Sequence, residues 1–99
     1  MPRRKRLKWG DEALDELDNH LAWYAERNPM AAERIANEID MAAQSLIAQP
    51  IAHPGRIGVI AGTRELVVGH RTPFTLIYMA TVDTIEILHV WHQSQEMPD

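Results

Sequence analysis

Histidines are the side chains most able to do chemistry in this cysteine-free sequence. His89 and His92 lie close together in "EILHVWHQSQ", residues 86–95. Metal-binding histidine pairs usually stand four apart on a helix or two apart on a strand, so that both rings share a face. These two are three apart on an expected strand, which points them to opposite faces. The other three histidines have no fixed spacing to this pair, so the sequence predicts no metal site and no cofactor.

No nucleophile stands in an activated setting. Ser45 and Ser94 lack a Gly-x-Ser-x-Gly elbow, and "PGRIGVIAGT" (residues 54–63) lacks the Lys-Ser/Thr ending of a phosphate-binding loop. Glu65 and Glu86 fall on two expected strands, where they could be cross-strand neighbours suited to acid–base work. Each alternates with apolar residues, so we expect both carboxylates to face solvent.

One constellation fits a reaction: Arg64, Arg71, Tyr78 and His92 all fall on or beside the last three expected strands. Arginine stabilises phosphate charge, and Tyr and His can move protons, which is the set that RNA cleavage through a 2′-hydroxyl needs. Three bases in residues 49–99 are few for gripping a polyanion, however. A buried tyrosine with two surface arginines is the alternative interpretation, and the sequence leaves both open.

Composition favours an ordinary folded protein. The chain has 99 residues, 45% of them hydrophobic, which is enough for a single domain over residues 1–99 with one modest core. No apolar run approaches the roughly 18–20 residues that span a bilayer, and the basic N-terminus has no apolar export segment after it. The absence of cysteine excludes a disulfide framework. We therefore expect a cytoplasmic protein with no membrane association.

Charge is distributed unevenly along the chain. Residues 1–10 carry five positive charges and no negative one, whereas residues 11–48 carry nine acids and two bases. The whole chain has a formal net charge of −4. A basic arm on an acidic body is unlike the uniformly basic surface of a nucleic-acid-binding domain. The arm could contact phosphate, or its charges could protect the edge of a sheet.

Periodicity predicts a strand, two helices and three strands. A weak alternation over residues 3–9 indicates a short strand. Apolar spacing of three and four predicts helices over residues 11–27, with Asp11 as N-cap, and from Pro29 to before Pro50, with Asn28 as N-cap. The expected stripes are Leu14, Leu17, Leu21 and Tyr24 in the first helix, and Ala32, Ile35, Ile39, Ala42 and Leu46 in the second.

The second half of the chain is expected to be a loop over residues 49–62 and strands over 63–68, 74–80 and 85–91. Short connections imply antiparallel pairing. The fold class is therefore α+β, with order β-α-α-β-β-β and a helical hairpin packed on one face of a small antiparallel sheet. In the last strand Ile85 and Ile87 fall on one face and Leu88 and Val90 on the other. We expect an apolar face that the helices leave uncovered and that binds a partner.

Six motifs in this order resemble the RelE/ParE superfamily, the toxins of type II toxin–antitoxin pairs. They run from about Leu7 to Pro98 and share that family's β-α-α-β-β-β order. The motifs are Trp9–Leu17, Asn28–Arg34, Pro54–Arg56, Gly62–Val68, Pro73–Tyr78 and Ile85–His92. The sequence is most similar to the ParE branch, because the ribonuclease branch usually has an arginine in the middle strand. Here that strand reads Phe74-Thr75-Leu76-Ile77-Tyr78, and no arginine follows His92.

The resemblance implies a toxin that inhibits DNA gyrase, arrests growth, stabilises plasmids and has no hydrolytic site of its own. It also implies a cognate antitoxin, ParD-like with a ribbon-helix-helix DNA-binding part, in a hetero-oligomer; a homodimer is also possible. Candidates for target binding are Arg56, Arg64, Arg71, Trp91 and His92. Candidates for antitoxin binding are Leu7, Trp9, Ile77, Met79, Leu88 and Val90. Two alternatives stay open: a ribosome-dependent ribonuclease using Arg64, Tyr78 and His92, and a degenerate, non-toxic antitoxin-binding protein.

Overall fold

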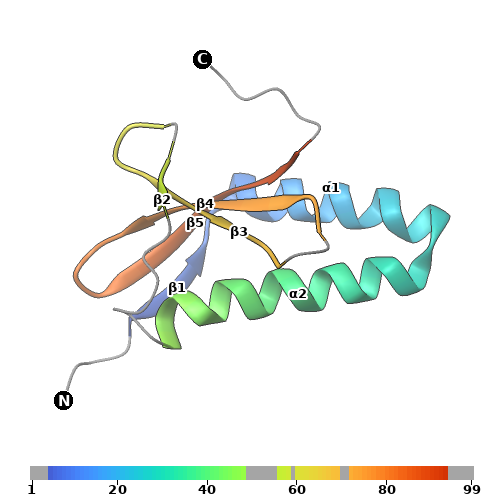
Figure 1. The fold of residues 1–99 in the computed structure, drawn as a ribbon, viewed down its shortest axis with the longest axis horizontal. Helices are drawn as coiled ribbons and strands as arrows, with labels where there is room; N and C mark the ends of the chain where they lie inside the picture. Colours follow the sequence, from blue (N-terminus) through green and yellow to red (C-terminus); the bar gives the residue numbers. More distant parts are fainter. Residues whose placement is uncertain (1–4, 49–55, 59, 70–71, 94–99) are drawn as a thin grey trace.

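The computed structural model describes residues 5–48, 56–58, 60–69 and 72–93 (Figure 1). Within them the predicted α+β class is confirmed, with two helices packed on one mixed sheet. The elements in chain order are β1 Arg6–Trp9, α1 Asp11–Arg27, α2 Pro29–Ala48, β2 Arg56–Ile57, β3 Arg64–Val67, β4 Phe74–Ala80 and β5 Thr84–His92. The short strand β2 falls in the segment that the sequence predicts to be a loop, because its two residues give too little pattern to detect.

Helix α1 has the predicted bounds but a different cap. Gly10 is the N-cap, with φ −69° and ψ 156° and no side-chain cap, and Asp11 is already helical. The prediction of Asp11 as N-cap is therefore wrong. The Gly10 N–H donates to the carbonyl oxygen of Ile87 at 2.9 Å, and a Cβ on Gly10 would lie 3.1 Å from that oxygen. A side chain at this position would require the start of α1 or β5 to shift by a few tenths of an ångström.

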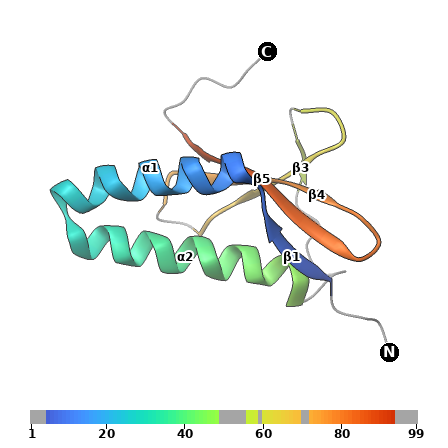
Figure 2. The same cartoon turned by 180° about the vertical axis from the view of Figure 1, so that it is seen from behind.

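Helix α2 begins as predicted. The side-chain oxygen of Asn28 accepts the N–H of Ala31 at 3.2 Å, which is the capping contact expected of an N-cap. Asn28 alone separates the two helices, and they run side by side as an antiparallel hairpin whose turn points away from β1 (Figures 1 and 2). The buried stripe of α2 consists of Ala32, Ile35, Ile39, Ala43 and Leu46, so Ala43 takes the place expected for Ala42.

The sheet has strand order β1-β5-β4-β3-β2. Pairs β2–β3, β3–β4 and β4–β5 are antiparallel, as short connections require, whereas β1 lies parallel to β5, with Leu7 opposite Ile85 and Trp9 opposite Ile87. The prediction of a wholly antiparallel sheet is wrong in this respect. The pairing joins the two ends of the described chain, and no local turn reveals such a long-range neighbour.

A β-bulge decides which side chains of β5 enter the core. Ile77 of β4 pairs with His89, but the next residue, Tyr78, pairs with Ile87, so Leu88 is the extra residue. Past a bulge the alternation of faces shifts by one. Ile85, Ile87 and Val90 therefore all lie in the core beneath the helices. The prediction that Val90 lies with Leu88 on the opposite face is wrong, because simple alternation ignores the bulge.

The main core lies between the hairpin and the sheet. Side chains of α2 meet Phe74, Leu76 and Tyr78 of β4 and the three inward residues of β5. In α1 it is Ala13 that is fully buried, whereas Leu14 keeps 42% of its surface exposed, against the prediction. On the other face of the sheet Ile77 is buried outside the main core, while Val67 and Met79 are 48% and 39% exposed. The uncovered apolar face is thus smaller than expected.

Candidate functional site

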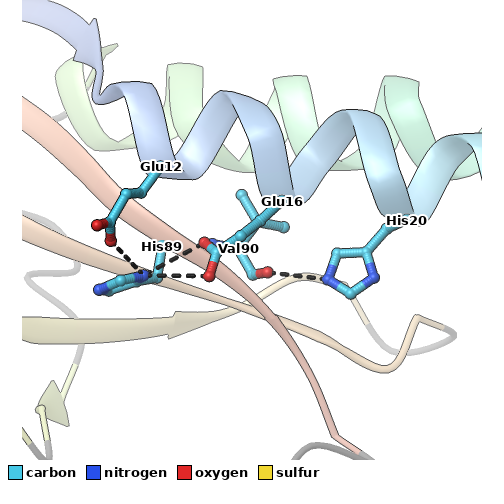
Figure 3. A network of polar contacts seen from close by, with 5 residues as sticks. All are labelled: Glu12, Glu16, His20, His89 and Val90. Carbon is cyan, nitrogen blue, oxygen red and sulfur yellow. Dashed lines mark hydrogen bonds and ion pairs between the residues drawn. The ribbon is translucent and has the colours of Figure 1, made fainter.

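A row of polar side chains on α1 faces the C-terminal half of β5. Its four members stand four residues apart, at successive turns of one side of the helix, and Figure 3 shows three of them reaching toward the strand. We call Glu12, Glu16, His20 and Tyr24 the α1 stripe. The apolar spacing of α1 does not reveal the first three members of the stripe. The regular spacing of hydrogen-bonding residues was the signal that could have revealed it.

The centre of the stripe binds the backbone of Val90. One carboxylate oxygen of Glu16 accepts the Val90 N–H at 2.9 Å, and the Nε2–H of His20 donates to the Val90 carbonyl oxygen at 3.1 Å (Figure 3). The neighbour strand β1 ends opposite Ile87, so Val90 lies past the last parallel pair. Two side chains of α1 thus supply the hydrogen bonds that a longer β1 would have made, and they close this edge of β5.

The same carboxylate binds a histidine on the other face of β5. Nδ1 of His89 lies 3.2 and 3.3 Å from the two oxygens of Glu16. Because a carboxylate only accepts, the Nδ1–H of His89 donates this hydrogen bond to Glu16. Glu12 is a weaker partner, at 3.9 Å with a side chain 81% exposed. The His89 ring in turn stacks on Trp91, with centroids 5.0 Å apart. Glu16 therefore connects the helix to the Trp91 side chain through His89.

Aromatic rings surround His92 at the end of β5. Its Nε2 and the Tyr24 hydroxyl lie 3.3 Å apart and share a hydrogen bond, whose direction depends on the tautomer of His92. Phe74 packs edge-on against both His20 and His92, at 5.1 and 5.2 Å, and the two histidine rings lie 6.0 Å apart. Burial, and secondarily the nearby charge of His20, lower the pKa of His92 below its ordinary value.

A shallow cavity of about 270 Å³ opens where α1 begins. It lies beside the bulged residue Leu88 and next to the Glu12–His89 end of the stripe. Its lining residues are Gly10, Asp11, Glu12, Glu86, Leu88 and His89. Three of these six residues, Asp11, Glu12 and Glu86, are acidic.

The residues that would form a ribonuclease site are not brought together. Arg64 and Tyr78 are cross-strand partners, but His92 pairs with Phe74, four residues before Tyr78 in β4. That separation is roughly 13 Å at about 3.3 Å per residue. Tyr78 is also 1% exposed, and burial raises its pKa above 10.0, although the charge of Arg64 partly opposes this. A buried phenol with a raised pKa is poorly suited to moving protons at neutral pH.

The other target-binding candidates are dispersed. Arg64 is exposed on β3, whereas Trp91, 9% exposed, and the half-buried His92 lie at the end of β5 on opposite faces of the strand. Arg71 lies outside the described residues, and only the backbone of Arg56 is described.

The two acidic candidates also behave differently from the prediction. Glu65 is buried, at 3% exposure, against the expectation that it faces solvent. It is not a neighbour of Glu86 either, since β4 separates their strands.

The candidates for antitoxin binding do not share one exposed face. Leu7 and Trp9 pack against the main core, and Val90 lies inside it. Ile77 is fully buried on the other side of the sheet. Among the six, Met79 exposes 39% of its surface and Leu88 lines the cavity. In this structure, therefore, Ile77 and Val90 have no surface to offer a partner.

The described part of the chain contains neither a cluster of metal ligands nor a membrane-spanning helix. No three His, Asp or Glu side chains there are grouped so that they could hold a metal ion. No helix there combines the length and the apolar character needed to cross a membrane.

Comparison with known proteins adds the family. The sequence family described as "ParE toxin of type II toxin-antitoxin system, parDE" matches residues 7–97. The chain is 38% identical over 95 residues to the protein named "Putative toxin Y4kP" from Sinorhizobium fredii (strain NBRC 101917 / NGR234). The match covers 96% of this chain and 95% of that protein.

A solved structure shares the fold. The structure titled "Chromosomal ParDE TA system from P. aeruginosa" contains a chain that matches with a TM-score of 0.79 and 24% identity, over 90% of this chain and 96% of that one. The resemblance that the six sequence motifs indicate is thereby confirmed by the family match over nearly the whole chain. This protein belongs to the ParE toxin family of type II toxin–antitoxin systems.

Proposed function

We propose that this protein, as one toxin domain over residues 1–99, arrests growth by inhibiting DNA gyrase. The observation that carries the proposal is the match of the ParE toxin family over residues 7–97. The dispersal of Arg64, Tyr78 and His92 supports it, because a toxin that traps an enzyme needs a binding surface and no catalytic centre. The target-binding surface that we propose is the end of β5, where the half-buried His92 and the exposed 9% of Trp91 reach the surface on opposite faces of the strand.

We also propose that a ParD-like antitoxin neutralises the toxin in the cytoplasm. The solved structure of similar fold comes from a ParDE pair, which supports a partner of this kind. Exposed apolar side chains such as Leu14, Val67 and Met79 give an extended antitoxin segment apolar surface to cover. Such covering would explain why these side chains are exposed in the isolated chain.

Inducible expression in a bacterium tests the proposal. We expect growth arrest, loss of negative supercoiling in a reporter plasmid, and intact messenger RNA; co-expression of the cognate antitoxin should restore growth. Cleaved messenger RNA with normal plasmid supercoiling would instead favour the ribonuclease alternative. Normal growth without the antitoxin would favour a degenerate toxin.

A further inference from the structure

We infer that Glu16 and His20 are positioning residues: they hold the end of β5 in the orientation in which Trp91 and His92 meet the target. The inference rests on the proposed function, since it assumes that this end of the strand binds gyrase. It concerns two residues of α1 that need not touch the target themselves.

Two side chains of α1 bind the two backbone polar groups of Val90. The N–H and the carbonyl of one strand residue point to the same edge of the strand. Glu16 holds the N–H at 2.9 Å and His20 holds the carbonyl oxygen at 3.1 Å. Both side chains come from one helix, a single turn apart. Because two bonds from one rigid element act on one residue, they fix both the position of the strand and its rotation about its own axis.

The residues on either side of Val90 also contact the α1 stripe or residues bound to it. Glu16 also binds His89, whose ring stacks on Trp91 on the face away from the helices. On the helix face His92 lies between Phe74 and Tyr24, the next member of the stripe. The stripe therefore reaches both proposed target-binding side chains, one through His89 and one through Tyr24. A rotation of the strand at Val90 would move both of them.

The chemistry of Glu16 favours a positioning role over simple stabilisation of the fold. The Glu16 side chain keeps only 26% of its surface exposed, and partial burial of a carboxylate carries a desolvation cost that an apolar side chain avoids. An apolar residue would pack α1 onto β5 without fixing the orientation of the strand. A carboxylate that binds one N–H and one imidazole fixes direction as well as contact.

The experiment uses the purified full chain with four variants: Glu16→Ala, Glu16→Gln, His20→Ala and His20→Gln. The glutamine amide keeps an acceptor oxygen for the Val90 N–H at position 16 and a donor N–H for the Val90 carbonyl at position 20. Asp18→Ala and Asp18→Asn are matched controls, because Asp18 is an exposed acid on the same helix. Circular dichroism selects variants that are folded at the assay temperature.

Two readouts follow each variant: inhibition of gyrase supercoiling, and exchange of the Val90 amide proton measured by NMR. We expect both alanine variants to inhibit about tenfold less strongly, which is the effect of losing one oriented bond. Glu16→Ala should also exchange the Val90 proton about tenfold faster, because it removes the acceptor of that proton. His20→Gln should recover most of the inhibition. Glu16→Gln should keep the Val90 proton protected but recover inhibition only in part, because an amide binds His89 more weakly than a carboxylate does. The Asp18 variants should match the wild type. If the alanine variants do not fold, Glu16→Gln alone decides: it should weaken the His89–Trp91 contact in NMR while Val90 stays protected.

Several results would overturn the inference. Folded alanine variants that inhibit as well as the wild type would do so, as would lost inhibition in Glu16→Ala with unchanged Val90 exchange. An unaltered His89–Trp91 contact in Glu16→Gln would do so where the alanine variants are unfolded. Failure of the wild type itself to inhibit gyrase would overturn the proposed function instead; Val90 exchange in Glu16→Ala would then still decide whether Glu16 holds the strand.

Discussion

Glu16 accepts the backbone N–H of Val90 at 2.9 Å, a contact between residues 74 positions apart in the chain. It occurs just past the point where β1 ends and just after the bulge at Leu88. The bulge places the polar groups of Val90 on the open edge of the strand, and α1 closes that edge. This relationship joins the N-terminal helix to the strand that carries the proposed target-binding residues.

Removal of the Glu16 carboxylate should destabilise the fold. Glu16→Ala leaves the Val90 N–H without its acceptor in a partly buried place, and we expect the free energy of unfolding to fall by about 1–3 kcal/mol. Asp18→Ala, on the exposed side of the same helix, should change it by less than about 0.5 kcal/mol. Urea unfolding of the three proteins measures both values. Equal stability of the two variants would contradict the role assigned to Glu16.

Acid should weaken the fold through His92. Because its pKa is lowered by burial and by His20, the unfolded chain takes up this proton at a higher pH than the folded chain does. The stability that neutral His92 provides is full above its ordinary value of 6.5 and is lost as pH falls through the lowered folded value. Urea midpoints at about pH 7.5 and 5.5 should therefore differ more in the wild type than in His92→Gln. The same pH dependence in both proteins would count against this reading.

Tyr78 should titrate at an unusually high pH. The chain has two tyrosines, so Tyr24→Phe leaves Tyr78 as the one phenol to follow by ultraviolet absorbance. We expect its midpoint above the ordinary 10.0, because burial disfavours the phenolate. Arg64→Gln in the same background should raise it further, since the Arg64 charge lowers this pKa. The urea-unfolded protein provides the reference, and a folded midpoint at or below that reference would show that Tyr78 is solvated.

Core and surface positions on α2 should differ sharply. Ile39 is 1% exposed beneath the hairpin, whereas Met41, two residues on, is 69% exposed. We expect Ile39→Ala to reduce the free energy of unfolding by about 2–5 kcal/mol, because it leaves a cavity. Met41→Ala should cost less than about 0.5 kcal/mol. Thermal or urea unfolding distinguishes them, and a costly Met41→Ala would place that side chain in an interface between copies of the chain.

Local pattern was enough to predict most elements. The bounds of α1, the Asn28 cap and strand β4 follow from nearby residues alone: spacing of apolar side chains, a capping amide before Pro29, and β-branched or aromatic residues between turns. The ParE family also follows from short motifs in order. All of these signals are carried by residues close together in the chain.

Features that depend on distant residues escaped prediction. The parallel pairing of β1 with β5 joins residues far apart, and the bulge at Leu88 arises from the register with β4. That bulge moved Val90 into the core and so removed it from the expected partner surface. The α1 stripe was missed for a related reason: Glu16 looks like a solvent-facing acid until the edge of β5 is placed beside it.

The most direct test of the account is purified protein added to DNA gyrase and plasmid. At excess toxin we expect supercoiling to stop and cleaved plasmid to accumulate after detergent and protease treatment, with both effects reversed by the antitoxin. Full supercoiling with no trapped cleavage complex, from a toxin that is folded and binds its antitoxin, would contradict gyrase as the target.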